Sequence, residues 1–485
     1  MFSFSPRSFL VLPCTLLAAQ PAFAQAPAAP PPAAESPPSA PVAEPAPPPT
    51  PAPEVAPPPV ATAATPPPPA VEPEAPAPSL LPVKLGTDVW SRFEVRENYD
   101  KLGVSRGRFQ EGDETFFRAR LTLESNALQL TDGATGLVYF APQATGIWGT
   151  QGLGGTVGEA SLGIYEAYFK LATPSLAVKA GRFALNYGDA LVIGNLDWHQ
   201  SGRAFDGAHL RYSFGKASVD AFVTQLSDGW PGLNKTFLIG DNYFWGLYGQ
   251  FGELLAEGLA LDVYALGKSA AATDVPVDPT DPTLGTAHVD GATFVTLGAR
   301  AKQKLDAFDY RIEAGLQVGK TPARSAPLNK LAYQADVEAG YAPVKGFHLA
   351  LNGAIASGDG DATDDADNAW DELYPTTHKW FGLTDVIGLR TNVMSLNLKL
   401  SGNVTASTTA TLDAHVFARP QSNGLGRAPD ANSDLAGYEL DAQLIQKIGK
   451  YAGVRGLYCV FIPNKDYYGS DKLAHFFELQ AGLKF

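Results

Sequence analysis

Residues 310–319 read Tyr-Arg-Ile-Glu-Ala-Gly-Leu-Gln-Val-Gly, a run in which apolar side chains alternate with polar or small ones. One face carries Tyr310, Ile312, Ala314, Leu316 and Val318, and the other carries Arg311, Glu313, Gly315, Gln317 and Gly319. Because successive residues of a strand point to opposite faces, this period of two predicts a β-strand with one apolar and one polar side.

The same alternation recurs in segments of about ten residues from Val83 to the end of the chain, for example at residues 117–124 and 394–401. We count about 18 such segments, and an even number is typical of single-chain bacterial outer-membrane barrels. No run of about 18 apolar residues follows residue 25, so a helical membrane protein is excluded.

Aromatic residues support the barrel interpretation. Clusters at 165–169 and 243–248 are predicted to lie in aromatic girdles, and the last alternating segment ends on Phe485, as the final strand of an outer-membrane barrel does. A soluble sandwich shows the same local pattern but needs a linker to divide its domains, and none follows Pro82. We therefore predict an all-β fold, a closed antiparallel transmembrane β-barrel of about 18 strands, for residues 83–485.

The N-terminal residues have two different compositions. Residues 1–24 contain Arg7, a short apolar core and a small-x-small site at 22–24, which predict a signal peptide. Residues 25–82 are predicted to be a disordered, extended Pro/Ala-rich spacer in the periplasm, because residues 26–82 contain 24 prolines. This spacer either binds a periplasmic or cell-wall partner or serves only as a tether.

Charge is distributed as a pore for anions requires. The formal net charge of -14 argues against nucleic-acid binding, but much of the acid lies in two loop-like stretches, 271–290 and 359–372. Bases share the polar faces of several strands, and a lumen lined with them favours anions. They are predicted to line the pore or, alternatively, to pair with lumen acids such as Glu124, Asp309 and Glu313. The predicted strand bases include Arg92, Arg96, Arg118, Arg120, Arg300, Lys302, Lys304 and Arg311.

Two further stretches carry a family resemblance. The first contains Gly-Arg-Phe-Ala-Leu-Asn-Tyr-Gly-Asp at 181–189, Gly-Asn-Leu-Asp-Trp at 194–198 and Gly-Arg-Ala-Phe-Asp-Gly at 202–207, and ends at 209–212. The second runs from Ser357 to Val393 and includes Asp-Glu-Leu-Tyr-Pro-Thr-Thr-His-Lys at 371–379. Together they resemble the signature of the alginate export family of outer-membrane porins.

The resemblance implies an 18-stranded monomeric barrel in the bacterial outer membrane, with a basic, constricted lumen that passes a polyuronate. The motif arginines are Arg182, Arg203, Arg211 and Arg390, which are expected to face the pore, with Asp197 and Asp206 positioning them by salt bridges. Alternatively, these motif residues hold inward-folded loops. The expected partners are an anionic polysaccharide or small organic anions, together with outer-membrane lipid.

Weaker patterns concern metal binding and catalysis. Asp359, Asp361, Asp364 and Asp365 invite a calcium interpretation but lack EF-hand spacing, so a solvated loop is expected and no cofactor is predicted. His199 and Ser201 resemble the pair of a barrel-embedded acyl hydrolase, but they lie inside the export motif, and we predict no enzyme. The remaining alternatives are a diffusion porin for small carboxylates and a structural barrel that links the outer membrane to the cell wall.

Overall fold

The computed structural model describes residues 83–104, 111–148, 161–227, 242–276, 285–323, 326–361, 363–421, 427–428 and 431–485. The predicted signal peptide (1–24) and spacer (25–82) lie outside the described residues.

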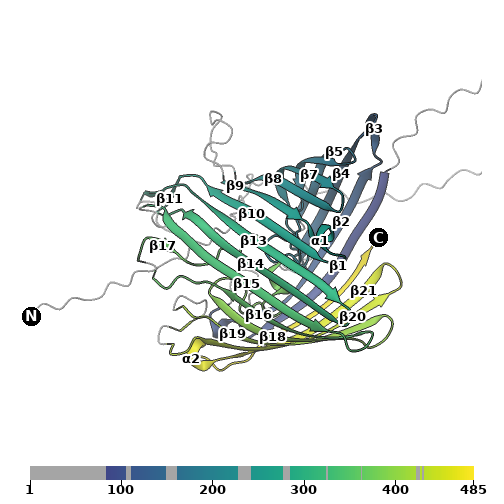
Figure 1. Ribbon diagram of the computed structural model, residues 1–485. Helices are drawn as coiled ribbons and strands as arrows, with labels where there is room; N and C mark the ends of the chain where they lie inside the picture. The colour runs from purple at the N-terminus through teal and green to yellow at the C-terminus, as the bar shows by residue number, and fades with distance from the viewer. Residues whose placement is uncertain are drawn as a thin grey trace, which may run out of the picture. The chain divides into compact units, whose positions relative to one another are not determined.

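One antiparallel barrel accounts for most of the described chain (Figure 1). Its sheet has 20 strands, of which β3 and β17 are short additions, so that 18 form the wall. Each wall strand pairs with the next one along the chain, and β1 pairs with both β2 and β22, which closes the barrel. The predicted fold class and strand number are therefore confirmed. The wall strands are β1 (Val83–Glu97), β2 (Gly112–Ser125), β4 (Ala134–Ile147), β5 (Ser161–Ala172), β6 (Leu176–Phe183), β7 (Phe205–Phe214), β8 (Ala217–Ser227), β9 (Asn242–Gln250), β10 (Ala260–Ala270), β13 (Ala292–Leu305), β14 (Phe308–Thr321), β15 (Leu328–Tyr341), β16 (Phe347–Ala356), β18 (Val393–Asn403), β19 (Thr408–Ala418), β20 (Leu435–Ile448), β21 (Ala452–Pro463) and β22 (Ala474–Lys484).

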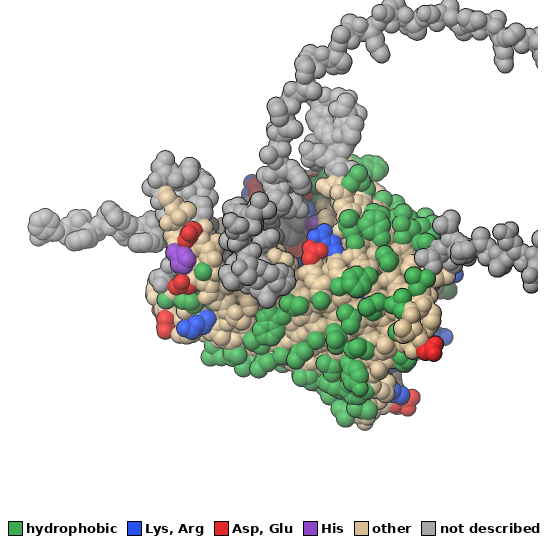
Figure 2. Space-filling model, turned by 90° about the horizontal axis from the view of Figure 1, so that it is seen from above, with side chains coloured by type: hydrophobic (Ala, Val, Ile, Leu, Met, Phe, Trp, Pro, Cys, Tyr) green, Lys and Arg blue, Asp and Glu red, His purple; other side chains and the backbone are tan. Residues whose placement is uncertain are grey.

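The alternating residues of β14 lie in turn on the outer and the inner face of the barrel wall. Ile312 and Leu316 are exposed on the outer face, whereas Arg311, Glu313 and Gln317 are buried on the inner face. Hydrophobic side chains cover much of the outer wall visible in Figure 2. A closed sheet suits a lipid surround because every wall strand has a hydrogen-bonded neighbour on each side.

The smaller elements lie outside the wall or in its connections. Strands β11 (Thr273–Pro276) and β12 (Thr286–Val289) form a separate hairpin, and β17 (Ala366–Asp367) pairs in parallel with β15. The other short elements are β3 (Leu128–Thr131), α1 (Gly252–Leu255), α2 (Lys465–Tyr468), η1 (Asp100–Leu102) and η3 (Thr377–Lys379). No helix in the described ranges has the length and apolar character to cross a membrane.

The connections at the two ends of the barrel differ in length. Those at 173–175, 215–216, 306–307 and 449–451 have two or three residues, whereas those at 184–204 and 357–392 leave the opposite end and are long. This difference between short turns at one end and long loops at the other is typical of outer-membrane barrels, whose short turns are periplasmic.

The girdle prediction is wrong for part of the aromatic residues. Phe244, Tyr248 and Tyr165 point inward and are buried, whereas Phe169 is exposed on the outer face. Aromatic residues near the short turns, such as Phe308 stacked on Tyr341, lie on the outside instead. The inward rings pack against long loops that enter the lumen.

Candidate functional site: two paired loops and a basic lumen

The loops at 184–204 and 357–392 fold into the barrel and pair with each other. Tyr374 N donates to Val192 O over 3.0 Å, Gly194 N donates to Tyr374 O over 2.7 Å, and Ile193 and Tyr374 form a parallel β-bridge. These are the two stretches that carry the family resemblance. Their apolar side chains, including Ile193 and Ile387, are buried. We call this pair of segments the lumen loops.

Arginines from β1 and β2 hold the first lumen loop to the wall. Arg92 donates to Trp198 O over 2.6 Å, and Arg118 donates to Asp197 O over 3.0 Å. The Asp197 carboxylate also lies 3.1 Å from Arg118 and 3.3 Å from Arg120. Guanidinium groups suit this role because their donors can satisfy a carbonyl and a carboxylate at once.

Arg203 joins the two lumen loops directly. Its Nη1 lies 3.3 Å from Gly194 O in the first loop and 2.9 Å from Pro375 O in the second. Leu191 and Val192, which lie shortly before Gly194 in the first lumen loop, are buried. The junction between the two loops is therefore part of a packed core. A guanidinium bound to two carbonyls stabilises the approach of the two backbones.

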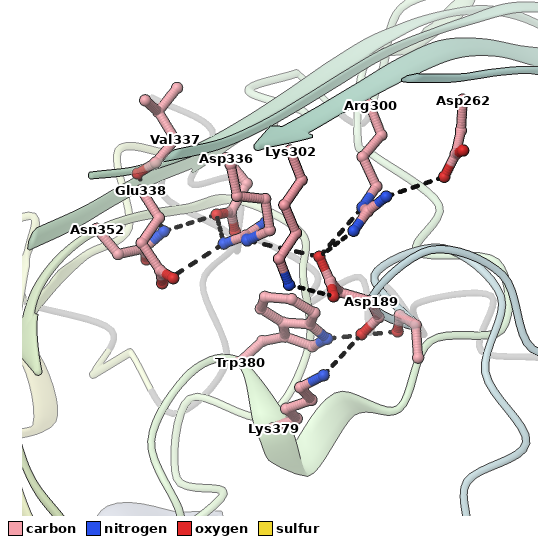
Figure 3. A network of polar contacts seen from close by, with 12 residues as sticks. Asp189, Asp262, Arg300, Lys302, Asp336, Val337, Glu338, Asn352, Lys379 and Trp380 are labelled. Atoms are coloured by element: carbon pink, nitrogen blue, oxygen red, sulfur yellow. Dashed lines mark hydrogen bonds and ion pairs between the residues drawn. The ribbon is translucent and has the colours of Figure 1, made fainter. Parts of the chain in front are cut away.

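A polar network connects the first lumen loop with β10, β13 and β15 (Figure 3). Arg300 donates to Asp189 over 2.7 Å and to Asp262 over 3.0 Å, and Lys302 lies 3.1 Å from Asp189. Lys379, from the second loop, donates to the backbone oxygen of Asp189 over 3.0 Å. Although partial burial opposes ionisation, Arg300 and Lys302 lower the pKa of Asp189 to about 2.

The network continues through Asp336 on β15. Its carboxylate accepts hydrogen bonds from Arg311 over 2.6 Å and from Arg390 over 2.8 Å. In the second lumen loop, Glu372 accepts a hydrogen bond from the Arg390 backbone, and burial raises the pKa of Glu372 to about 7. Arg390 therefore fixes the second lumen loop to β15, whereas Arg311 joins β14 to β15, and both present little surface to the lumen.

The side chains that remain accessible in this network are lysines. The side chain of Lys302 is 50% exposed, and Lys379 is also exposed, whereas Asp336 is only 1% exposed and Asp189 17%. A solute approaching the lumen loops therefore meets the ammonium groups of these lysines first, because the carboxylates of Asp189 and Asp336 are less exposed. Lys379 was missed in the sequence because its charge sits in a loop with no alternating pattern.

The remaining predicted arginines on the inner wall, Arg96 and Arg211, differ in exposure. Arg96 is buried 2.5 Å from Glu94, which also pairs with Arg92. Arg211 is 43% exposed on the inner wall and pairs with Asp220 over 2.6 Å. It lines a cavity with Lys170 and Lys179, which the sequence analysis did not single out.

Arg182 and Asp206 do not line the pore. They pair across β6 and β7 over 2.6 Å and lie on the outer face, since Phe183 and His209, which have the opposite parity along these strands, point inward. The prediction that they face the lumen is therefore wrong. The inner face is apolar here because it packs against the first lumen loop, so the usual distribution of polar and apolar faces is reversed.

The calcium and hydrolase patterns gain no geometric support. In the described part of the chain no group of three His, Cys, Asp or Glu residues is placed to hold a metal ion. Asp361 and Asp364 instead accept hydrogen bonds from backbone amides two residues further on. The ring of His199 accepts a hydrogen bond from the Ser201 backbone, so that ring nitrogen is engaged by an amide.

The family model described as alginate export matches residues 82–456. The chain belongs to the alginate export family. It is accordingly an outer-membrane channel rather than an enzyme. No curated protein matches the chain.

Solved structures show the same fold at low identity. OccAB2 of Acinetobacter baumannii has a TM-score of 0.56 and 10% identity, covering 83% of this chain and 98% of that one. OccK10 (OpdN) of Pseudomonas aeruginosa has a TM-score of 0.54 and 11% identity, with coverages of 83% and 99%. The outer-membrane protein OprD of the same species has a TM-score of 0.51 and 11% identity, with coverages of 83% and 93%. At these identities the likeness concerns the fold alone.

Proposed function

We propose that this member of the alginate export family passes anions, and that its cargo is an anionic polysaccharide of the polyuronate type. The carrying observation is the position of the Lys302 and Lys379 ammonium groups, which are accessible beside the lumen loops while the neighbouring carboxylates are buried. The description of the family as alginate export supports outward movement of an acidic polymer.

Lysines and arginines contribute differently to the proposed mechanism, and Lys302 and Lys379 also contact Asp189 of the first lumen loop. Arginines such as Arg203 and Arg390 hold the lumen loops in place through hydrogen bonds to protein groups. The lysines lower the barrier for a carboxylate, because a cation at a constriction favours anion entry. Each ammonium group offers a weak, replaceable contact, so a charged chain can advance from one to the next.

The test is the reversal potential of the purified full-length protein in a planar bilayer under a potassium chloride gradient. We expect anion preference in the wild type and a reduced preference in Lys302→Gln/Lys379→Gln. Lys450→Gln, in the short turn at 449–451, removes the same charge away from the lumen loops and should leave the potential unchanged. A wild-type channel that prefers cations would overturn the proposal.

One observation favours a second candidate, a diffusion porin for small carboxylates. The lumen loops bond to each other across the interior of the barrel, at Val192–Tyr374 and Gly194–Tyr374, which narrows any passage. A long uronate oligomer should block chloride current and reach the far side of a bilayer if the polymer is cargo. Passage of monomeric uronate without passage of the oligomer would select the small-solute porin.

The termini and assembly state belong to the same proposal. We propose that the barrel works as a monomer and that the spacer at 25–82 extends in the periplasm, where it contacts a periplasmic or cell-wall partner. Co-sedimentation of the wild type with purified cell wall, lost on deletion of residues 25–82, would support the partner. Equal sedimentation of both proteins would leave the spacer as a tether.

A further inference from the structure

A second basic site lies on the inner wall, closer to the short turns. It is a cavity of about 190 Å³ between β5, β6, β7 and β8 and the start of the first lumen loop. That volume greatly exceeds what a single water requires and admits a small organic molecule. Its polar lining includes Lys170, Lys179, Arg211, Asp220 and Asn186.

Two lysines lie side by side in the lining of this cavity. Lys170 on β5 and Lys179 on β6 are direct cross-strand partners. Neither has an ion pair or a hydrogen bond to another described residue, and the Lys179 ammonium lies 5.1 Å from the centre of the Tyr168 ring. Like charges directly opposite each other on a sheet are destabilising, so their placement costs folding stability unless an anion lies between them.

The neighbouring acids Glu166 and Asp220 attract Lys179 electrostatically, but neither forms a direct ion pair with it. The Asp220 carboxylate forms an ion pair with Arg211, with distances of 2.6 and 2.7 Å, and one of its oxygens also lies 3.4 Å from His209. Glu166, on the same strand as Lys170, accepts a hydrogen bond from Ala184 N over 2.8 Å. The cavity therefore offers two ammonium groups whose charges are not matched by a directly bound carboxylate.

The rest of the lining suits a sugar ring. Asn186 presents an exposed amide, which can donate to and accept from hydroxyl groups. Leu185 and Phe183, both largely buried, also line the cavity and supply its apolar wall. A carboxylate held by two cations, with hydroxyl groups beside an amide and carbon atoms against an apolar wall, describes a sugar acid.

We propose that this cavity is a binding subsite for one hexuronate residue, with its carboxylate held between Lys170 and Lys179. This inference rests on the proposed anion transport and specifies its first contact, since both lysines lie within four residues of the short connection at 173–175. The same chemistry is present in a free sugar acid and in a residue of a polyuronate chain.

The site also connects with the lumen loops. Tyr187 lines the cavity, contacts His209 over 3.2 Å and precedes Asp189, the residue that binds Arg300. A ligand in the cavity therefore contacts the base of the first lumen loop.

Binding can be measured by calorimetry on the full-length protein in detergent, with glucuronate and a hexameric oligouronate as probes and glucose as the uncharged control. We expect glucuronate to bind and Lys170→Gln/Lys179→Gln to weaken its binding about a hundredfold, because each of the two lost charge-assisted contacts contributes about tenfold. Lys179→Arg keeps the charge and should retain binding. Tighter binding of the hexamer would identify a polymer chain as the ligand, and equal binding would identify a free sugar acid; both support the subsite.

The result that overturns the subsite is equal glucuronate affinity in the wild type and in Lys170→Gln/Lys179→Gln. Folding of the double variant is checked by the heat-dependent gel mobility of the barrel, and removal of opposed like charges should not impair it. The outcome is separable from that of the proposed function. An anion-selective wild type with unchanged glucuronate binding in the double variant rejects the subsite alone, whereas a cation-selective wild type rejects anion transport.

Discussion

Asp189 is the single carboxylate that fixes the first lumen loop to β13, and Asp189→Asn should loosen that loop. Arg300 and Lys302 bind its carboxylate over 2.7 and 3.1 Å. They lower its pKa from 3.8 to about 2 despite partial burial. At about 1.36 kcal/mol per pKa unit, this depression corresponds to about 2–3 kcal/mol of stabilisation at neutral pH. Loss of that energy increases the population of a detached loop by about 30- to 150-fold.

Single-channel recording at pH 7 measures this population as the time spent at high conductance. We expect Asp189→Asn to lengthen that time and to increase anion preference, because Lys302 loses its counter-charge. Asp206→Asn, which removes a carboxylate from the outer face, is the matched control. Because the folded pKa is depressed, the stabilisation is complete above pH 3.8 and is lost as pH falls toward about 2. A folded Asp189→Asn channel with wild-type conductance and selectivity would refute the proposed anchor.

Three further predictions concern the lumen loops and the outer wall. Glu372, with a pKa raised to about 7 by burial, binds a proton in the folded loop that an ordinary Glu loses near pH 4.5, so loop stability should fall as pH rises to about 7. Recordings between about pH 4.5 and 7 should show increasing open time in the wild type and none of this dependence in Glu372→Gln. Arg203→Gln removes contacts to Gly194 O and Pro375 O and should raise conductance through loss of about 1–3 kcal/mol between the loops, measured against Arg182→Gln as control. Arg182→Gln itself should leave the reversal potential unchanged, because Arg182 lies on the outer face, and a shift in that potential would contradict its placement.

The wall could be predicted from sequence because apolar and polar residues alternate along each strand, and this alternation indicates which face is turned outward and which inward. In β14, Ile312 and Leu316 alternate with Arg311 and Gln317, and this pattern can be recognised without knowing the rest of the chain. The partners of the inward bases could not be predicted. Arg92 contacts Trp198, and Arg118 contacts Asp197, across separations of 106 and 79 residues that no local pattern encodes.

The error at Arg182 has a more general cause. A polar-inside rule assumes that the lumen is filled with water, but the inner faces of β6 to β9 carry Phe183, Phe205, Phe222 and Phe244. These rings pack on the first lumen loop, with Phe205 and Phe244 against Tyr374 of the second. Where a loop fills the barrel, the inner face obeys the rules of a protein core, and a charged pair such as Arg182–Asp206 takes the outer position.

The same loops explain why the arginines that hold them are inaccessible to a solute, whereas neighbouring lysines remain accessible. A lumen loop buried inside a barrel must satisfy its backbone carbonyls and its carboxylates without water, and the forked guanidinium does this better than an ammonium group. Arg92, Arg203 and Arg390 are used in this way, so their charges are largely matched by protein groups. Lys170, Lys179 and Lys302 lie beside the loops and not beneath them, with fewer contacts to the protein. Anion selectivity in this channel is therefore expected to depend on lysines whose positions are fixed by arginines. Neutralising Lys302 should change selectivity and, because Lys302 also binds Asp189, should loosen the first lumen loop in part, whereas neutralising Arg203 should change loop opening with little change in selectivity.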